Sequence, residues 1–291
     1  MKTLGVLANL SKPAARETLR RIADCARRLD LRLATCDQTA RLLPEARLWQ
    51  PQTFRRKIEA LLALGGDGAM LYAVRMIGDA DIPVLGVNLG SLGFLTSVPV
   101  DRVEEALAAL AGGQCIESCR TRLECRLIRG RRNLGRHYAL NDVVLGWGTT
   151  SRVVTLTLSV NGEPVDTTVC DGLIVSTPTG STGHSLSAGG PVLHPGSPVF
   201  VVNPICPHTL SNRPIVIPDG SVVEIQVESA DKNLLLVVDG QEHSAVRKGD
   251  RVRVSLADRG VRILNLPGYS YFNVLRKKLH WSGSSVERGE K

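Results

Sequence analysis

The stretch IEALLALGGDGAMLYAVRMIGDADIPVLGV, residues 58–87, decides the fold of the first part of the chain. It opens with an apolar run, Ile58 to Leu64, which predicts a buried β-strand. Gly65-Gly66-Asp67-Gly68 follows, then a helical stretch, Ala69 to Ile77, and then a second buried-strand candidate, Pro83 to Val87. Strands that alternate with helices predict a parallel sheet with helices on its faces.

The residues before this stretch continue the same alternation. Thr3 to Ala8 reads as a buried strand, Ser11 as the cap of a following helix, and Leu31 to Cys36 as a second strand. We therefore expect an α/β domain over residues 1–98 that carries the Gly-Gly-Asp-Gly element. A closing helix within residues 269–281 is expected to pack back on this domain.

The second half of the chain has a strand pattern instead. Between Val154 and Val160, apolar residues alternate with Ser and Thr, and the hairpin signal Asn161-Gly162 follows directly. Leu234 to Val238 leads in the same way into Asp239-Gly240. These patterns predict an all-β, sandwich-like domain over residues 99–268.

Composition narrows the classes of function. The chain of 291 residues is 43% hydrophobic and 22% charged, with no secretory pattern and no run of 18 apolar residues. Its seven cysteines contain no CxxC pair, which favours free thiols over a zinc site and, with the previous point, a cytoplasmic location without membrane attachment. The net charge of +8 suits phosphate-bearing partners, whereas the few aromatic residues argue against a base-stacking nucleic-acid surface.

Gly65-Gly66-Asp67-Gly68 is the first candidate site. At the carboxyl end of a strand, Gly65, Gly66 and Gly68 let backbone N–H groups approach a phosphate, and the following helix N-terminus favours anions. A carboxylate in such a cradle makes sense if Asp67 accepts a proton or engages a hydroxyl or metal ion. A plain turn is the alternative, because neither a P-loop nor a GxGxxG fingerprint is present.

The second candidate is the block from Asp171 to Pro191. Between Ser176 and Ser187 nearly every residue is Ser, Thr or Gly, so the segment offers hydroxyls and open backbone to sugar and phosphate oxygens. A flexible linker is one alternative. A hydrolase triad of Ser181, His184 and Asp171 is another, although the GxSxG elbow is absent.

Two shorter motifs complete the set. Asn141-Asp142 enters an apolar run, and an amide beside a carboxylate can read adjacent ribose hydroxyls, although a plain turn is the alternative. Asn203 to Pro214 contains three prolines and predicts a rigid, shaped loop.

These four motifs in this order resemble the NAD kinase family, and the resemblance covers nearly the whole chain. It also includes Gly86 to Thr96 and Asp239-Gly240-Gln241. It implies transfer of a phosphoryl group from ATP, another nucleotide or polyphosphate to the 2′-hydroxyl of the adenosine ribose of NAD. Mg²⁺ or another divalent metal would accompany the donor, and no metal ligands are named. NAD would lie between the two domains and across a subunit interface, so a homo-oligomer, dimer or tetramer, is expected.

The resemblance also assigns residues. Asp67 matches the proton acceptor and an NAD contact, Gly68 a neighbouring NAD contact, and Asn141 with Asp142 the pair that holds ribose. The further NAD contacts that it implies are Arg152, Asp171, Thr182, Gly183, His184, Ser185, Leu186, Ser187 and Gln241.

Three positions depart from the family pattern. Asp142 stands where the family usually has Glu, and Ala69 where it often has Thr, Ser or Asn. Gly183-His184 replaces the usual Ala-Tyr, which removes an aromatic ring from the expected binding loop.

Two other classes of function remain as alternatives. A lipid kinase on the same scaffold would keep Asp67 but would not need the block from Asp171 to Pro191. A non-enzymatic module that binds nucleotides or nucleic acid is suggested by the positive charge. The agreement of the motifs in order and context favours the NAD kinase interpretation, with neither nucleic acid nor membrane as a partner.

Overall fold

The computed structural model describes residues 2–91, 93–147, 153–229 and 234–281, and the chain forms two compact units. Unit 1 comprises residues 1–118 and 262–291, and unit 2 comprises residues 119–261. The sequence placed the division at residues 98/99 and 268/269.

The structure divides the chain at residues 118/119 and 261/262 instead, and packing explains the difference. Helix α4 (Val103–Ala111) contributes to the core of unit 1, and strands β7 and β20, where the chain crosses between the units, belong to the sheet of that unit.

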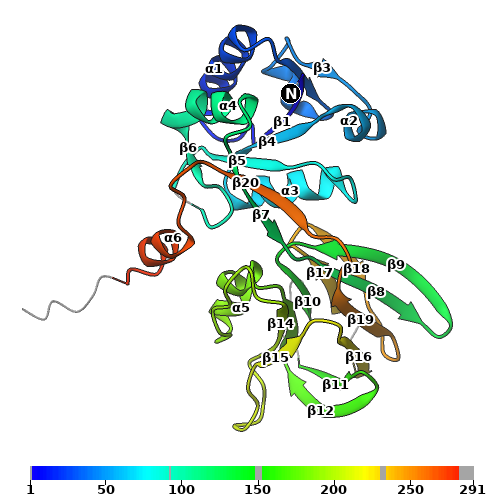
Figure 1. Ribbon diagram of the computed structural model, residues 1–291. Helices are drawn as coiled ribbons and strands as arrows, with labels where there is room; N and C mark the ends of the chain where they lie inside the picture. Colours follow the sequence, from blue (N-terminus) through cyan, green and yellow to red (C-terminus); the bar gives the residue numbers. More distant parts are fainter. Residues whose placement is uncertain (1, 92, 148–152, 230–233, 282–291) are drawn as a thin grey trace, which may run out of the picture. The chain divides into compact units, whose positions relative to one another are not determined.

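Unit 1 is built on a sheet of eight strands in the order β3-β2-β1-β4-β5-β20-β7, with β6 beside β5 (Figure 1). The pairs β1–β2, β1–β4, β2–β3, β4–β5, β5–β6 and β5–β20 are all parallel, as the strand–helix alternation predicts. The strands are β1 (Thr3–Ala8), β2 (Arg32–Thr35), β3 (Arg47–Leu48), β4 (Ala60–Gly65), β5 (Val84–Asn88), β6 (Val98–Pro99), β7 (Ile116–Arg120) and β20 (Val261–Asn265).

Helices cover both faces of this sheet (Figure 1). On one face, α1 (Ala15–Arg28) and α4 bury their apolar residues against β1, β4 and β5, and the Arg21 guanidinium binds Glu104 at 2.7 and 2.5 Å. On the other, α2 (Pro51–Lys57) packs so closely on β1 that a Cβ at Gly5 would lie 2.8 Å from Phe54. Helix α3 (Asp67–Ile77) follows β4, and α6 (Tyr271–Lys278) also belongs to unit 1.

The predicted cap of the first helix is wrong. Helix α1 begins at Ala15, so its cap position falls on Ala14, which has no side chain that could cap it. The Ser11 hydroxyl donates to Asn9 Oδ1 at 2.7 Å.

Unit 2 is an antiparallel sandwich of two six-stranded sheets that share one apolar core. The first sheet contains β15 (Ile215–Pro218), β14 (Val199–Ile205), β13 (Gly172–Ser176), β10 (Asp142–Trp147), β17 (Leu234–Val238) and β18 (Glu242–Ala245), in that order. The second contains β12 (Glu163–Cys170), β11 (Val154–Val160), β16 (Val222–Ser229), β19 (Arg251–Leu256), β8 (Leu123–Arg129) and β9 (Arg132–Ala139).

Two hairpins of the sandwich have the turns that the sequence predicts. Asn161 and Gly162 join β11 to β12 with φ of 52° and 84°, and Asp239 and Gly240 join β17 to β18 with φ of 50° and 66°. Two successive positive φ values are the mark of a type I′ turn, in which Asn-Gly and Asp-Gly are favoured.

Among the described residues, no helix is both long and apolar enough to cross a membrane.

Candidate functional site

The carboxylate of Asp67 lies at the N-terminus of α3, where the turn after β4 places it. Its Oδ1 accepts from the N–H groups of Leu95 (2.9 Å) and Thr96 (3.2 Å) and from the Thr96 hydroxyl (3.3 Å). Among the described residues, the one donor to its Oδ2 is Phe94 N–H, at 2.9 Å. A carboxylate oxygen has two lone pairs, so Oδ2 keeps a direction in which it can accept a substrate hydroxyl.

The loop after β5 is shaped to make these contacts. Asn88 is buried, donates to the Ser91 carbonyl at 2.5 Å and to Thr96 Oγ1 at 3.0 Å, and accepts from Gly90 N–H at 2.7 Å. A Cβ at Gly93 would lie 2.0 Å from Asp67 Oδ1, so only glycine fits beside the carboxylate. No site role was predicted for this loop, which joins β5 to β6.

The glycines around Asp67 differ in what surrounds them. Gly65 has φ of +154°, and a Cβ there would lie 2.7 Å from the Ala69 Cβ. At Gly66 and Gly68 a Cβ would meet nothing within 4 Å, so space for a ligand exists directly above these two residues.

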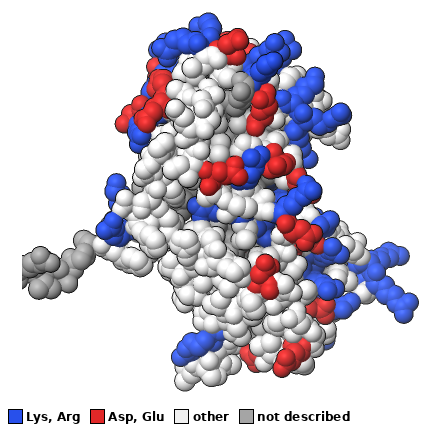
Figure 2. Space-filling view, in the orientation of Figure 1, with Lys and Arg blue, Asp and Glu red and all other residues white. Residues whose placement is uncertain are grey.

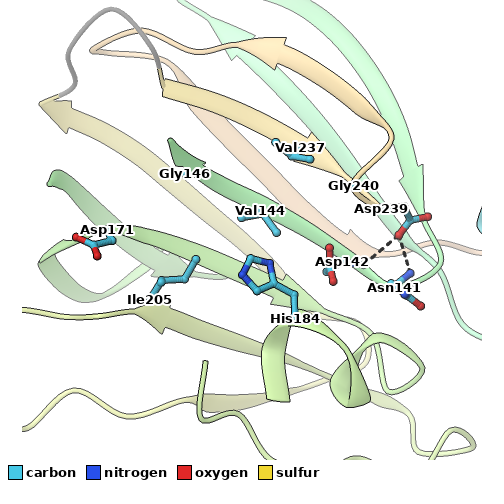
Figure 3. A pocket seen from close by; sticks show the side chains of 10 residues that line it. All are labelled: Asn141, Asp142, Val144, Gly146, Asp171, His184, Ile205, Val237, Asp239 and Gly240. Atoms are coloured by element: carbon cyan, nitrogen blue, oxygen red, sulfur yellow. Dashed lines mark hydrogen bonds between the residues drawn. The ribbon is translucent and has the colours of Figure 1, made fainter. Parts of the chain in front are cut away.

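A cavity of about 490 Å³ lies on the outer face of the first sheet of the sandwich. The alternation of strand β10 explains its position, because Val143 and Leu145 face the core whereas Asp142, Val144 and Gly146 line the cavity. The full lining is Asn141, Asp142, Val144, Gly146, Asp171, His184, Ile205, Val237, Asp239 and Gly240 (Figure 3). The volume is that of a site for a small molecule or a nucleoside.

Asn141 and Asp142 present unsatisfied polar atoms at this cavity. Asn141 Oδ1 is buried without a hydrogen-bond partner in the described part of the chain. Asp142 is 7% exposed, and burial, together with the charge of Asp239, raises the pKa of its carboxyl to about 7. Buried polar atoms usually have partners, so these groups are suited to receive hydrogen bonds from a ligand.

The block from Asp171 to Pro191 is ordered, which excludes the linker alternative. It contains strand β13, a 3-10 turn (Gly180–Thr182) and the short helix α5 (His184–Ser187). Asn203 Nδ2, from strand β14, donates to the Ser185 carbonyl at 2.9 Å and anchors this helix. His184 therefore points into the cavity from α5 (Figure 3).

The hydrolase alternative has no geometric support. The Ser181 hydroxyl is buried, donates to the Pro178 carbonyl at 2.7 Å and accepts from Leu193 N–H at 3.0 Å. A nucleophile needs its hydroxyl bonded to a base, and this hydroxyl is bonded to backbone.

The structure thus brings together four of the predicted NAD contacts, Asn141, Asp142, Asp171 and His184, in one cavity. Gln241 follows the lining residue Gly240, whereas Asp67 and Gly68 belong to unit 1, and Arg152 lies outside the described residues. Thr182, Gly183, Ser185, Leu186 and Ser187 surround His184 in the chain without lining the cavity.

Asp239 was not predicted as a site residue, although Asp239-Gly240-Gln241 served as a hairpin signal and as part of the family resemblance. The lining residues Val144, Gly146, Ile205, Val237 and Gly240 were missed as well. The alternation of core-facing and outward-facing residues along the strand that begins at Asp142 was the available signal for Val144 and Gly146.

Among the described residues, no group of three or more His, Cys, Asp or Glu side chains could hold a metal ion. The acidic side chain beside the glycine cradle, Asp67, already accepts from three backbone N–H groups.

Comparison with known proteins gives consistent matches. The model of the ATP-NAD kinase N-terminal domain matches residues 50–115, and that of the ATP-NAD kinase C-terminal domain matches residues 140–266. The chain is 36% identical to an NAD kinase of Magnetococcus marinus over 97% of this chain and 94% of that protein. It is 38% identical to an NAD kinase of Koribacter versatilis over 97% and 99% of the two chains.

Solved structures agree on the fold. A yeast NADH kinase in complex with NADH is 26% identical, with a TM-score of 0.91 over 100% of this chain and 90% of that chain. An NAD kinase from Archaeoglobus fulgidus, in complex with ATP, is 23% identical with a TM-score of 0.76 over 97% and 100% of the chains.

Proposed function

The chain belongs to the NAD kinase family, and from this premise we propose that it transfers a phosphoryl group from ATP to the 2′-hydroxyl of the adenosine ribose of NAD, giving NADP. One observation carries the proposal: four residues that the family pattern assigns to NAD, spread from Asn141 to His184, line a single cavity of about 490 Å³. The names of the relatives support NAD as the acceptor and the family name supports ATP as the donor. NADH, which the yeast enzyme binds, is the alternative acceptor, and polyphosphate the alternative donor.

In this proposal Asp67 orients the attacking hydroxyl and accepts its proton. The backbone N–H groups of Phe94, Leu95 and Thr96 fix the carboxylate, and Oδ2 has the free lone pair that the hydroxyl needs. Phosphoryl transfer has a loose transition state, so positioning contributes much of the rate and the proton can move late, as the new P–O bond forms.

Charge neutralisation is divided between the protein and the donor. The open space above Gly66 and Gly68 supports a role of Gly65, Gly66 and Gly68 as a cradle for the donor's phosphates. A divalent cation such as Mg²⁺ supplies neutralisation of the transferring phosphoryl group when it is bound with the donor. The described residues form no cage of three or more ligands, which fits a metal that is carried by the donor's phosphates.

Asn141 and Asp142 hold ribose in this proposal, because each presents a buried acceptor to the cavity. Asp171, His184 and Gln241 complete the NAD contacts with Arg152, Thr182, Gly183, Ser185, Leu186 and Ser187. The seven cysteines, none in a disulfide, support a reducing compartment such as the cytoplasm.

The test is NADP formation by the purified protein with NAD, Mg²⁺ and a panel of phosphoryl donors. Asp67→Asn keeps the size of the side chain and removes the proton acceptor, so kcat should fall by about 100-fold or more while NAD still binds. Asp30→Asn, at an exposed residue of the same unit, is the matched control and should retain wild-type kcat.

Two outcomes would contradict the proposal. A kcat for Asp67→Asn within a few-fold of wild type would remove Asp67 from the mechanism. Phosphorylation of diacylglycerol without any NADP formation would favour the lipid kinase alternative instead.

A further inference from the structure

The backbone of Leu140, Asn141 and Asp142, where strand β10 begins, is held by one side chain from the β17–β18 hairpin. Asp239 Oδ2 accepts from Leu140 N–H at 2.8 Å, and Oδ1 accepts from Asn141 N–H at 2.7 Å and from Asp142 N–H at 3.1 Å (Figure 3). The two segments are about a hundred residues apart in sequence, so no local pattern announces this contact.

The type I′ turn explains why the carboxylate reaches these groups. Asp239 has φ of 50°, and Gln241 N–H closes the turn on the Val238 carbonyl at 2.9 Å. The register pairs Val143 with Val238, and Asp239 N–H donates to the Asp142 carbonyl at 2.9 Å. Asp142 and Asp239 are therefore cross-strand neighbours, an arrangement in which two like charges destabilise each other.

The pairing of β10 with β17 places the carboxyl groups of Asp142 and Asp239 side by side in the lining of the cavity. Burial raises the pKa of Asp239, and the three backbone donors oppose that effect, whereas no described residue donates a hydrogen bond to the carboxyl of Asp142. The three backbone donors thus stabilise the ionised form of Asp239, whereas Asp142 has no such donors and its pKa is raised to about 7.

We propose that Asp239 is a positioning residue of this site: it holds Asn141 and Asp142 in place through their backbone, and its carboxylate lies beside that of Asp142, where its charge acts on the group that accepts hydrogen bonds from ribose. The inference rests on the proposed function for the identity of the ligand. An ionised Asp142 accepts charge-assisted hydrogen bonds from ribose hydroxyls, so NAD should bind more tightly as pH rises through about 7.

Other titratable groups face the same region and must be separated from Asp142. His184 from α5 and Asp171 before β13 line the cavity, and Glu242 on β18 bonds His137 of β9 at 2.8 Å and acts on Asp239. Measurements in an Asp142→Asn background identify whatever pH dependence belongs to these groups.

The test is calorimetric NAD binding between pH 5.5 and 8.5 with Asp239→Asn. Asparagine suits a type I′ turn, so the hairpin is retained while one carboxylate charge and one acceptor are lost. We expect NAD affinity to fall about tenfold at pH 8, because one acceptor for the backbone of Asn141 and Asp142 is lost. We also expect the pH at which NAD affinity is half lost on acidification to fall by about one unit or more, because the like charge beside Asp142 is gone. In the Asp142→Asn background, Asp239→Asn should cause no such shift.

Asn161→Asp is the matched control, since it exchanges amide and carboxylate at the other Asx-Gly hairpin. Asn161 is exposed, and its Oδ1, which Val222 N–H contacts at 2.8 Å, is retained in aspartate. This variant should bind NAD with the wild-type affinity and pH profile.

A second readout needs no NAD, and it compares the wild type with Asp239→Asn that circular dichroism shows to be folded. In the ligand-free wild type, ¹³C NMR of the side-chain carboxyl groups should show Asp142 titrating near pH 7, and about one pH unit or more lower in Asp239→Asn, because burial continues to raise the pKa of Asp142 when the charge of Asp239 is gone. An Asp142 that titrates near pH 4 in the wild type overturns the inference, as does an Asp239→Asn variant that loses thermal stability without a change in the Asp142 midpoint. A wild type that does not bind NAD but shows the coupled titration would instead count against the proposed function.

Discussion

Two effects disfavour the ionised form of the Asp142 side chain. Burial is the larger cause of its raised pKa, and the facing charge of Asp239 adds to it. In the family pattern a glutamate stands at this position, and the aspartate here is shorter by one methylene group. A group in this state weakens the folded protein whenever it is ionised, which is the usual compromise at a binding site.

Asp142→Asn should therefore stabilise the ligand-free protein in a pH-dependent way. The pKa of Asp142 is about 7 in the folded protein and about 4 when unfolded, so the folded state holds the proton more tightly and the free energy of unfolding falls as pH rises between these values. Three pKa units correspond to at most about 4 kcal/mol at pH 8, and to about half of that at pH 5.5.

Thermal melts at the two pH values measure this effect. The gain in Tm of Asp142→Asn over wild type should be about twice as large at pH 8 as at pH 5.5. Asp258→Asn, at an exposed position of the same unit, should give no gain at either pH. Equal gains of Asp142→Asn at both pH values would contradict the raised pKa.

The element that controls Asp67 is the loop between β5 and β6. Three consecutive N–H groups, from Phe94 to Thr96, converge on the carboxylate, and Asn88 braces the loop from the end of β5. Gly93 lies where any side chain would collide with Asp67. The loop therefore determines the direction of the carboxylate.

Gly93→Ala tests this dependence. The added methyl group would lie 2.0 Å from Asp67 Oδ1 and 2.5 Å from Thr96 Oγ1, so the carboxylate has to turn away from the loop. We expect kcat to fall at least about tenfold, since misplacement of a catalytic group by about 1 Å has effects of that order or larger. Gly90→Ala, whose Cβ would have its nearest contact at 3.9 Å, is the control in the same loop. Comparable kcat values for the two variants would show that the loop does not position Asp67.

On the scale of the whole molecule, the chain is basic, whereas the described lining of the cavity is acidic. The chain has a net charge of +8, and Figure 2 shows basic side chains grouped at the tip of the β8–β9 hairpin, where Arg131 and Arg132 are exposed. The described residues that line the cavity include Asp142, Asp171 and Asp239 but no Lys or Arg. NAD carries two phosphate charges, and among the described lining residues none is a cation that could offset them, whereas Arg152, which the family resemblance assigns to NAD, lies outside the described residues.

Because the family resemblance implies an NAD site that borrows residues from a neighbouring subunit, we expect the active species to be a homo-oligomer, dimer or tetramer. Light scattering at assay concentration should give a multiple of the 31.4 kDa chain mass, and specific activity should fall on dilution below the dissociation range. A monomer mass with full activity would contradict this expectation.

The sequence by itself determined the two architectures and most of the candidate residues. The alternation of strand and helix around Gly65-Gly66-Asp67-Gly68 predicted the parallel sheet, and the Asn161-Gly162 and Asp239-Gly240 signals predicted their hairpins correctly. These features are local or periodic, because they depend on backbone conformation and on which face of an element is apolar, and residue order records both.

Tertiary structure alone decided how the candidates act together. Asp239 reaches the backbone of Leu140 to Asp142 only because β10 and β17 pair in one register, and Asp67 is fixed by a loop that follows another strand. The same packing moved the division between the units to residue 118. Burial and the charges of distant neighbours set the pKa of Asp142, and these quantities arise only when segments far apart in the chain are packed side by side.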